Sequence, residues 1–336
     1  DVDGLLDQMD INAELDSEDG RLNAQVGIRN VIAQDKPINI FGTVNTDNLD
    51  VGRMIGNDII RQTSLKAGLK AQIGNRKVRS YVTIDSLIVD RMHLNGYDYS
   101  GIAGAGTLAE DAFNGTIICN DPNLNFMFQG AFALSNKTQN SRYDFFAVVG
   151  HADLNAMNID KRGISEIQFQ TKADFTRTSG GDIFGKIDIA DIIAKNNQGR
   201  HDIGNISLTS HSNDNKFRAR LNSKFADATF DGTAAMTTFV KDLQNVTLKK
   251  EIPALFRDPE YEWTGNTYQV SMKFHDSMNL LAFAIPGFYI ADSTSFNARI
   301  DRNGTLKADL KSSRIAFKEQ YLKGFNAMID NNDNSL

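Results

Sequence analysis

One eleven-residue pattern recurs along this chain, and it constrains the fold more than any other feature of the sequence. The segment IFGTVNTDNLD at residues 40–50 returns as FFAVVGHADLN at 145–155 and as IFGKIDIADII at 183–193, aligned without a gap. The second position of each copy is Phe: Phe41, Phe146 and Phe184. Near the end of each copy an Asn or Asp precedes an apolar residue: Asn48-Leu49, Asp153-Leu154 and Asp191-Ile192.

Weaker copies extend the pattern along the chain. A degenerate copy, VRSYVTIDSLI, starts at Val78, and fainter ones start at Gly115 and Leu221, so that successive starts are 30 to 38 residues apart. A period of about 20–50 residues is typical of solenoids and other stacked arrays, in which each unit buries its apolar face on its neighbours. We therefore expect the three aligned Phe residues to be equivalent rungs of one extended wall. We also expect the chain to double back after each of the three apolar residues that close a copy.

Long segments alternate apolar and polar residues with the period of two that is typical of β-strands. In the run from Leu124 to Leu134, apolar side chains recur on one face, while the other face carries Asn125, Met127 and Gln129. Similar alternation occupies residues 22–28, 143–150, 167–175, 268–275, 296–300 and 306–310. The last two runs flank Asn303-Gly304, a dipeptide that strongly favours a hairpin turn.

These patterns predict a mainly β fold. We expect an elongated, curled sheet of antiparallel type, a β-groove or solenoid, built from degenerate repeats of about 38 residues. Helical patterns are short and fall in the connections, at residues 47–61, 188–195 and 277–284. The strand pattern is interrupted softly at residues 249–261 by two prolines and several charges. This break predicts a repeat segment, 1–250, and its continuation, 251–336; the alternative is one continuous domain.

Composition and motifs argue against several classes of function. A formal net charge of -6 without a basic patch argues against a nucleic-acid partner. The single cysteine, Cys119, excludes an internal disulfide, and its apolar setting predicts a buried structural thiol. No GxSxG, HExxH or Walker A motif is present, and the five histidines are scattered. We therefore expect no enzyme, no catalytic or metal-binding residues and no cofactor.

The one-sided apolar strands raise the question of what covers them. Because the helical patterns are few and short, the sheet must fold onto itself or expose an apolar channel. Two readings stay open for the Phe-rich faces, an ordinary core and a groove that holds apolar cargo. The repeat favours the groove, since an array of long strands makes a continuous wall. The predicted lining residues are Phe126, Phe128, Phe132, Leu134, Phe145, Val149, Phe169, Val270, Met272 and Phe274.

The C-terminal third resembles a known family. Residues 279–300 read NLLAFAIPGFYIADSTSFNARI and residues 312–333 read SSRIAFKEQYLKGFNAMIDNND. With the strand exits Ala152-Asp153-Leu154 and Ala190-Asp191-Ile192, they are similar to the TamB family of translocation and assembly proteins, of a divergent Gram-negative type. That family is related to the AsmA-like and other bridge-like lipid-transfer proteins.

The resemblance implies a periplasmic β-groove, anchored in the inner membrane by a helix outside this chain. It implies phospholipid as cargo between the inner and outer membranes, with an outer-membrane barrel protein as partner. The chain would then be a middle segment of a longer protein. Two alternatives stay open: a scaffold that assembles outer-membrane proteins by β-augmentation, and a secreted surface β-solenoid such as an adhesin or carbohydrate-binding module.

Overall fold

The computed structural model describes residues 2–5, 7–33, 36–56, 59–74, 78–109, 111–133, 140–214, 216–244, 263 and 265–330. The fold is mainly β, as predicted, with one antiparallel sheet that does not close and a few short helices. The contacts divide the chain into two units. Unit 1 comprises Asp1–Asn136 with Asp144–Gln170, and unit 2 comprises Lys137–Tyr143 with Thr171–Leu336. Each unit is described by itself.

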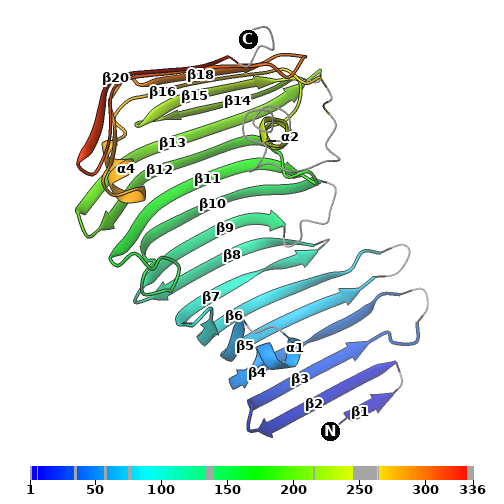
Figure 1. Cartoon of the computed structure of the whole chain (residues 1–336). Helices are drawn as coiled ribbons and strands as arrows, with labels where there is room; N and C mark the ends of the chain where they lie inside the picture. The colour runs from blue at the N-terminus through cyan, green and yellow to red at the C-terminus, as the bar shows by residue number, and fades with distance from the viewer. Residues whose placement is uncertain are drawn as a thin grey trace. The chain divides into compact units, whose positions relative to one another are not determined.

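Unit 1 is a meander in which each strand pairs antiparallel with the next, from β1 to β10 (Figure 1). Strand β10 enters the unit at Asp144, and β11 leaves it after Gln170. The elements are β1 Val2–Leu5, β2 Gln8–Ser17, β3 Gly20–Arg29, β4 Ile38–Asp50, α1 Val51–Ile55, β5 Ile60–Ile73, β6 Tyr81–Leu94, β7 Tyr97–Ala109, β8 Ala112–Asp121, β9 Leu124–Ala133, β10 Asn140–Asp153 and β11 Ser165–Thr178.

Unit 2 continues the antiparallel pattern with one change of order. Strands β12 to β16 pair in sequence, β16 then pairs with β18, and β18 and β20 lie on either side of β19, which also pairs with the short β17. Figure 1 shows β12 and β13 bending along their length. The elements are β12 Ile183–Asn196, β13 Gly199–Asn213, β14 Lys216–Ser223, β15 Ala226–Gly232, α2 Met236–Asp242, β16 Tyr268–Phe274, α4 Met278–Ala284, β17 Phe288–Ile290, β18 Ser295–Ile300, β19 Leu306–Phe317 and β20 Gln320–Asp330.

The sequence repeat corresponds to a pair of antiparallel strands. The copies that start at 40, 78, 115, 145 and 183 fall on β4, β6, β8, β10 and β12, which are alternate strands. One period is therefore one strand out and one strand back. The faint copy at Leu221 starts on β14, the next alternate strand, and like the copy at Gly115 it crosses the turn into the following strand.

Three copies share a local irregularity at the same aligned position. The pairing register shifts between Thr46 and Leu49 in β4, between Ile84 and Leu87 in β6, and between Ile189 and Ile192 in β12. Such shifts are β-bulges, which bend and twist a strand without ending it. The expected reversal after Ile192 is wrong, because β12 continues to Asn196. The one expected after Leu49 is confirmed, because β4 ends one residue later, at Asp50, and the chain passes through α1 into the antiparallel β5. At Leu154 the strand does end, and a connection to β11 begins.

Other local predictions have mixed outcomes. The helical pattern at 277–284 is confirmed by α4, and the 47–61 pattern contains the short α1. The predicted helix at 188–195 is wrong, because these residues belong to β12. There Ile187 and Ile189 alternate with Lys186 and Asp188, and all four pair with β13. The hairpin at Asn303-Gly304 is confirmed, with Ile300 opposite Leu306. The break at 249–261 lies outside the described residues, so the predicted boundary after residue 250 stays a prediction.

Candidate functional site

One face of unit 1 is apolar from β2 to β10. The strand registers place a single residue of each strand in a straight row across the sheet, and no member of that row is polar. Its members are Ala13, Ala24, Val44, Ala67, Leu87, Gly104, Ile117, Phe128 and Ala147. A second apolar row runs beside it: Ile11, Val26, Gly42, Leu69, Ile84, Gly106, Gly115, Gly130 and Phe145.

Much of this face is partly open to solvent. Ala24, Val44, Ala67 and Leu87 are half-buried rather than buried. Neighbouring side chains on the same sheet cover part of each residue, and the rest of its surface is accessible to solvent. Soluble proteins rarely expose large contiguous apolar areas, so a continuous apolar face of this kind is a candidate binding surface.

Toward β10 the face becomes aromatic, and its side chains pack against one another. Phe128 is 6% exposed and packs against Phe113, Phe132 and Phe145. The ring centroid of Phe128 lies 5.3 Å from those of both Phe132 and Phe145. A neighbouring cluster of Val149, Ala152 and Met157 gathers the remaining side chains at this end of the face: Tyr97, Tyr99, Leu124, Phe126, Leu154, Ile167 and Phe169.

The predicted lining residues of unit 1 are thus brought together on one face. Phe126, Phe128, Phe132, Phe145, Val149 and Phe169 all belong to these two clusters. Leu134 lies outside the described residues. Their role as a lipid lining stays a prediction, because such clusters are also what an ordinary hydrophobic core would contain.

Unit 2 has an apolar face of its own. Met272 belongs to a row that crosses the sheet without a polar member: Ile187, Leu208, Leu221, Ala228, Met272, Phe296, Leu310 and Ala327. The other two predicted residues flank it on β16, with Val270 opposite Phe230 and Phe274 opposite Ala226. The three predicted residues of unit 2 therefore share one face.

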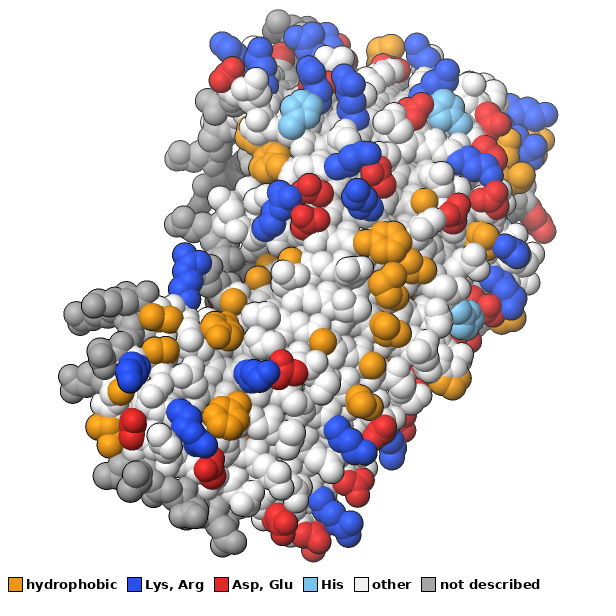
Figure 2. Space-filling model, turned by 180° about the vertical axis from the view of Figure 1, so that it is seen from behind, with side chains coloured by type: hydrophobic (Ala, Val, Ile, Leu, Met, Phe, Trp, Pro, Cys, Tyr) orange, Lys and Arg blue, Asp and Glu red, His pale blue; other side chains and the backbone are white. Residues whose placement is uncertain are grey.

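In each unit, the face opposite the apolar one carries ion pairs. Ion pairs link neighbouring strands there, for example Lys70 with Asp85 at 2.9 Å and Arg218 with Asp231 at 2.5 Å. Figure 2, a view from one side, shows charged side chains of both signs, with hydrophobic side chains among them. The registers of unit 1 give an apolar row on this side: Ile88, Ala103, Ile118, Met127 and Val148. In unit 1, the face opposite the apolar rows is therefore not uniformly polar.

The three aligned Phe residues do not form one wall. Phe41 is 40% exposed, lies opposite Gly27 on the charged face and stacks under the guanidinium of Arg29. Phe146 is 38% exposed and lies opposite Gln129 on the same face of unit 1. Phe184 instead contacts Phe217, with ring centroids 5.8 Å apart, on the apolar face of unit 2. The alignment located equivalent strands but not equivalent side-chain directions.

Helix α2 lies on the apolar face of unit 2 and was not predicted. The ring centroid of Phe239 lies 5.4 Å from that of Phe230 and 5.1 Å from that of Tyr268. The fully buried carboxylate of Asp242 accepts hydrogen bonds from the Tyr268 hydroxyl at 2.5 Å and from Asn266 at 3.0 Å. The sequence signal for α2 was the loss of alternation at 234–237, which is short and easily taken for a loop.

Beneath the first turn of α2 is a cavity of about 210 Å³. Strands β12 to β15 form its floor, and the helix start forms its roof. Its lining is mostly apolar: Ile183, Phe184, Leu208, Phe217, Ala219, Phe230, Ala235 and Met236. Asp182, Arg218 and Thr237 stand at its border, and Ser210 belongs to the floor beside Ala219.

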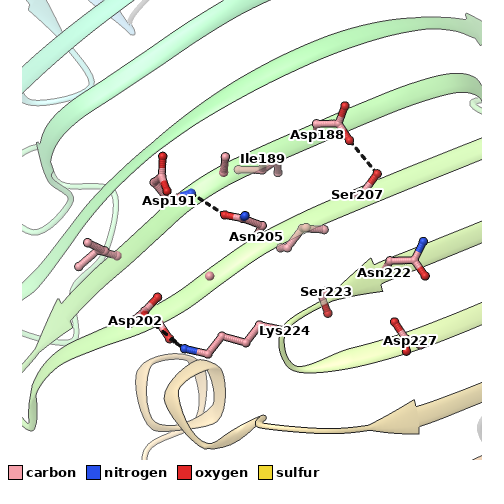
Figure 3. Close-up of a pocket in the computed structure, with 14 residues that line it drawn as sticks. Asp188, Ile189, Asp191, Asp202, Asn205, Ser207, Asn222, Ser223, Lys224 and Asp227 are labelled. Carbon is pink, nitrogen blue, oxygen red and sulfur yellow. Dashed lines mark hydrogen bonds and ion pairs between the residues drawn. The ribbon is translucent and has the colours of Figure 1, made fainter.

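A larger, polar hollow of about 830 Å³ is shown in Figure 3. One cross-strand row contributes Asp188, Ser207, Asn222 and Asp227. Ser207 donates to Asp188 at 2.7 Å, and Lys186 pairs with Asp188 at 2.8 Å. Hydrogen bonds from Lys186, which has the larger effect, and from Ser207 hold the pKa of Asp188 below its usual range.

The other carboxylates of this hollow are also engaged. Lys224 pairs with Asp202 at 3.1 Å, and His275 is 2.8 Å from Asp227. Asp188, with its lowered pKa, is a poor general acid, because a catalytic acid needs a pKa near the working pH. Among the described residues, no group of three or more His, Cys, Asp or Glu side chains is arranged to hold a metal ion.

The predicted buried thiol is confirmed. Cys119 on β8 is 3% exposed, and burial raises the pKa of its thiol. A buried thiol with a raised pKa is a weak nucleophile.

Comparisons with protein-family models, curated proteins and solved structures return no match. In the described part of the chain, every helix is too short or too polar to cross a membrane.

Proposed function

We propose that this chain is a non-enzymatic segment of a membrane-bridging protein that conducts phospholipid along its apolar sheet face. The observation that carries the proposal is the pair of unbroken apolar rows from β2 to β10 in unit 1. With neighbouring strands about 4.8 Å apart, eight strand spacings give an apolar path of roughly 38 Å. That length exceeds the hydrocarbon thickness of a bilayer leaflet, which is about 15 Å.

Burial of an acyl chain against the apolar face is enough to account for its movement along the sheet. An acyl chain gains about 0.8 kcal/mol for each methylene that leaves water. Two rows made only of Ala, Val, Leu, Ile, Phe and Gly offer apolar contact at each strand, so no step along the path is strongly preferred. Transfer then needs no catalytic residue, only continuity of the apolar surface.

The wider setting follows from the resemblance to the TamB family. We propose on this basis that the chain lies in the periplasm of a Gram-negative cell, with its inner-membrane anchor outside this segment. We also propose an outer-membrane barrel protein as partner. These assignments belong to the proposal and are tested with it.

Photo-cross-linking in cells tests the proposal. A benzophenone amino acid replaces Phe128 on the apolar face, and a second variant carries it at the half-buried Val44 of the same row. The matched controls are Gln129 and Asn45, the next residues along the same strands, which face the other way. We expect phospholipid adducts by mass spectrometry at Phe128 and Val44 and none at the controls. Adducts only with other parts of this chain would overturn the proposal.

A second candidate is a scaffold that pairs with nascent outer-membrane strands. Strand β20 pairs with β19 on one side, and among the described residues no strand pairs with its other edge. Met328 and Tyr321 on this strand are 74% and 55% exposed. An open edge with exposed apolar side chains favours β-augmentation. Cross-linkers at Gln320 and Asn326 would then capture barrel proteins rather than lipid.

The carbohydrate-binding reading is less well supported. Trp263 is half-buried, packs against the core cluster around Tyr268 and donates its indole N–H to the carbonyl of Arg302 at 2.8 Å. The only tryptophan of the chain is therefore engaged in the fold rather than presented as a sugar-binding platform.

A further inference from the structure

The cavity beneath α2 differs from the rest of the apolar face because it has a roof. Ala235, Met236 and Thr237 at the helix start lie over strands β12 to β15. Two interactions hold that roof in place at opposite ends of the helix. Thr237 donates to Asp182 at the N-terminal end, and Asp242 accepts from Tyr268 at the C-terminal end.

The interior of the cavity is suited to hydrocarbon. Three aromatic rings, those of Phe184, Phe217 and Phe230, stand in its wall, and Leu208 and Ala219 complete the floor. Ser210 is the one hydroxyl contributed by the floor. An apolar site disfavours ions, because an ion would lose hydration without gaining a partner.

The charged groups at the border are already committed. Asp182 accepts two hydrogen bonds from Thr237, and Arg218 pairs with Asp231 at 2.5 Å. Neither group is directed at a ligand inside the cavity. The polar part of a ligand would therefore stay at the border, in solvent, while its apolar part enters.

We propose that this cavity binds the terminal segment of a single saturated alkyl chain of an amphiphile. This inference rests on the proposed function for the class of ligand, but it names a fixed site where the open face offers a path. The volume of about 210 Å³ admits only a short segment of chain. A dry engineered cavity of about 150 Å³ already binds benzene, so a site of this size is large enough for specific binding.

Site-directed labelling with a defined probe tests the inference. The probe is dodecanoic acid with a diazirine at its terminal carbon, irradiated with the purified chain and followed by peptide mass spectrometry. We expect the label to concentrate on Phe184, Leu208, Phe217 and Met236. In competition, each methylene added to a short fatty acid should tighten binding about fourfold until the cavity is full, after which the gain should level off.

Variants make the test specific. Ala219→Leu and Ser210→Leu add bulk inside the cavity and should each reduce labelling there at least tenfold. The matched control is Ala327→Leu, which adds the same bulk on the apolar face of β20, away from the lining. Circular dichroism confirms that each variant is folded, and the labelling map of the unmodified chain needs no variant.

The outcomes separate the two proposals. Labels spread evenly over the apolar faces and unaffected by Ala219→Leu would overturn the cavity and leave lipid conduction standing. Labels confined to the cavity, with no phospholipid adduct at Phe128 or Val44 in cells, would support the cavity and overturn conduction. Absence of labelling anywhere on the chain would overturn the cavity as well.

Discussion

The carboxylate of Asp182 caps a helix that begins more than fifty residues further along the chain, through Thr237. It accepts a hydrogen bond from the backbone N–H of Thr237 at 3.1 Å and from its hydroxyl at 2.6 Å. The residue at the N-cap position of α2, Ala235, has no side-chain group to donate or accept. A turn residue between β11 and β12 thus supplies the acceptor that the helix itself lacks.

Removing this cap should loosen α2. Replacing Asp182 with Ala should cost about 1 kcal/mol, the usual cost of losing an N-cap acceptor. Since α2 roofs the cavity, amide hydrogen exchange at residues 236–242 should accelerate while exchange in β13 stays unchanged. Glu18→Ala, in the exposed β2–β3 turn, removes a carboxylate elsewhere and should leave α2 unaffected. Unchanged exchange in α2 after Asp182→Ala would show that the cap does not hold it.

The bulges of the repeat should also be sensitive to substitution. Asn48 and Asp191 occupy the same aligned position and both have positive φ, 49° and 54°. Their backbone N–H groups donate to side chains on the following strand, Ser64 at 2.8 Å and Asn205 at 2.9 Å. Asn and Asp tolerate this left-handed conformation better than other residues with a Cβ. The residue type and the hydrogen bond therefore both stabilise the bulge in these two copies.

Substitutions at Asn48 separate backbone from side-chain effects. Asn48→Ala should destabilise the protein by about 1 kcal/mol, because Ala is strained at positive φ. Asn48→Gly should be near neutral, because Gly adopts this conformation freely. Asn45→Ala on the same strand is the control, and urea unfolding followed by circular dichroism is the measurement. Equal effects of Ala and Gly at Asn48 would contradict the strain argument.

The sequence predicted the fold class well because strand alternation is a local property. The runs at 22–28, 124–133 and 268–274 all became strands, since period-two patterns need no knowledge of distant residues. The repeat located alternate strands for the same reason. Side-chain direction was less accessible: the next residues, Gly42 and Ala147, lie on the apolar face, so Phe41 and Phe146 point away from it by simple alternation.

The cavity and its helix could not be predicted from the sequence. Asp182 and Thr237 are brought together only by the path of β12 to β15. Neither residue belongs to a motif, and the seven residues of α2 carry no strong helical pattern. The apolar faces were predicted residue by residue, whereas the roof over one of them is a property of the tertiary structure.

The two faces of unit 1 should respond differently to the same substitution. Phe128→Ala opens a hole in the aromatic cluster and should cost about 3–5 kcal/mol. Phe146→Ala removes a ring that is 38% exposed on the other face and should cost much less, below about 1.5 kcal/mol. Both effects can be measured by urea unfolding. Similar losses for the two variants would contradict the face assignment.

A buried carboxylate in unit 1 should make its stability depend on pH. Asp121, 7% exposed, accepts hydrogen bonds from the Tyr97 hydroxyl, from the backbone N–H of Asn123, and from both the backbone N–H and the hydroxyl of Ser100. Burial alone would raise the pKa of Asp121, but these hydrogen bonds outweigh it, and the pKa lies below its usual range. Burial, with the bond to Asp121, raises the pKa of Tyr97 to about 12.

The sign of the pH effect follows from the lowered pKa of Asp121. A carboxyl with a lower pKa in the folded state stabilises the protein fully above its unfolded pKa of about 3.9, and this contribution is lost as the pH falls through the folded value. Asp121→Asn keeps the shape but places an amide N–H₂ among donors, so it should cost about 1–3 kcal/mol at pH 6. The difference between the two proteins should shrink at pH 3, below the unfolded pKa of about 3.9, because the unfolded chain there binds a proton that the folded state resists. Hydrogen exchange in β7 and β8 at both pH values measures it, and a difference that grows on acidification would contradict the assignment.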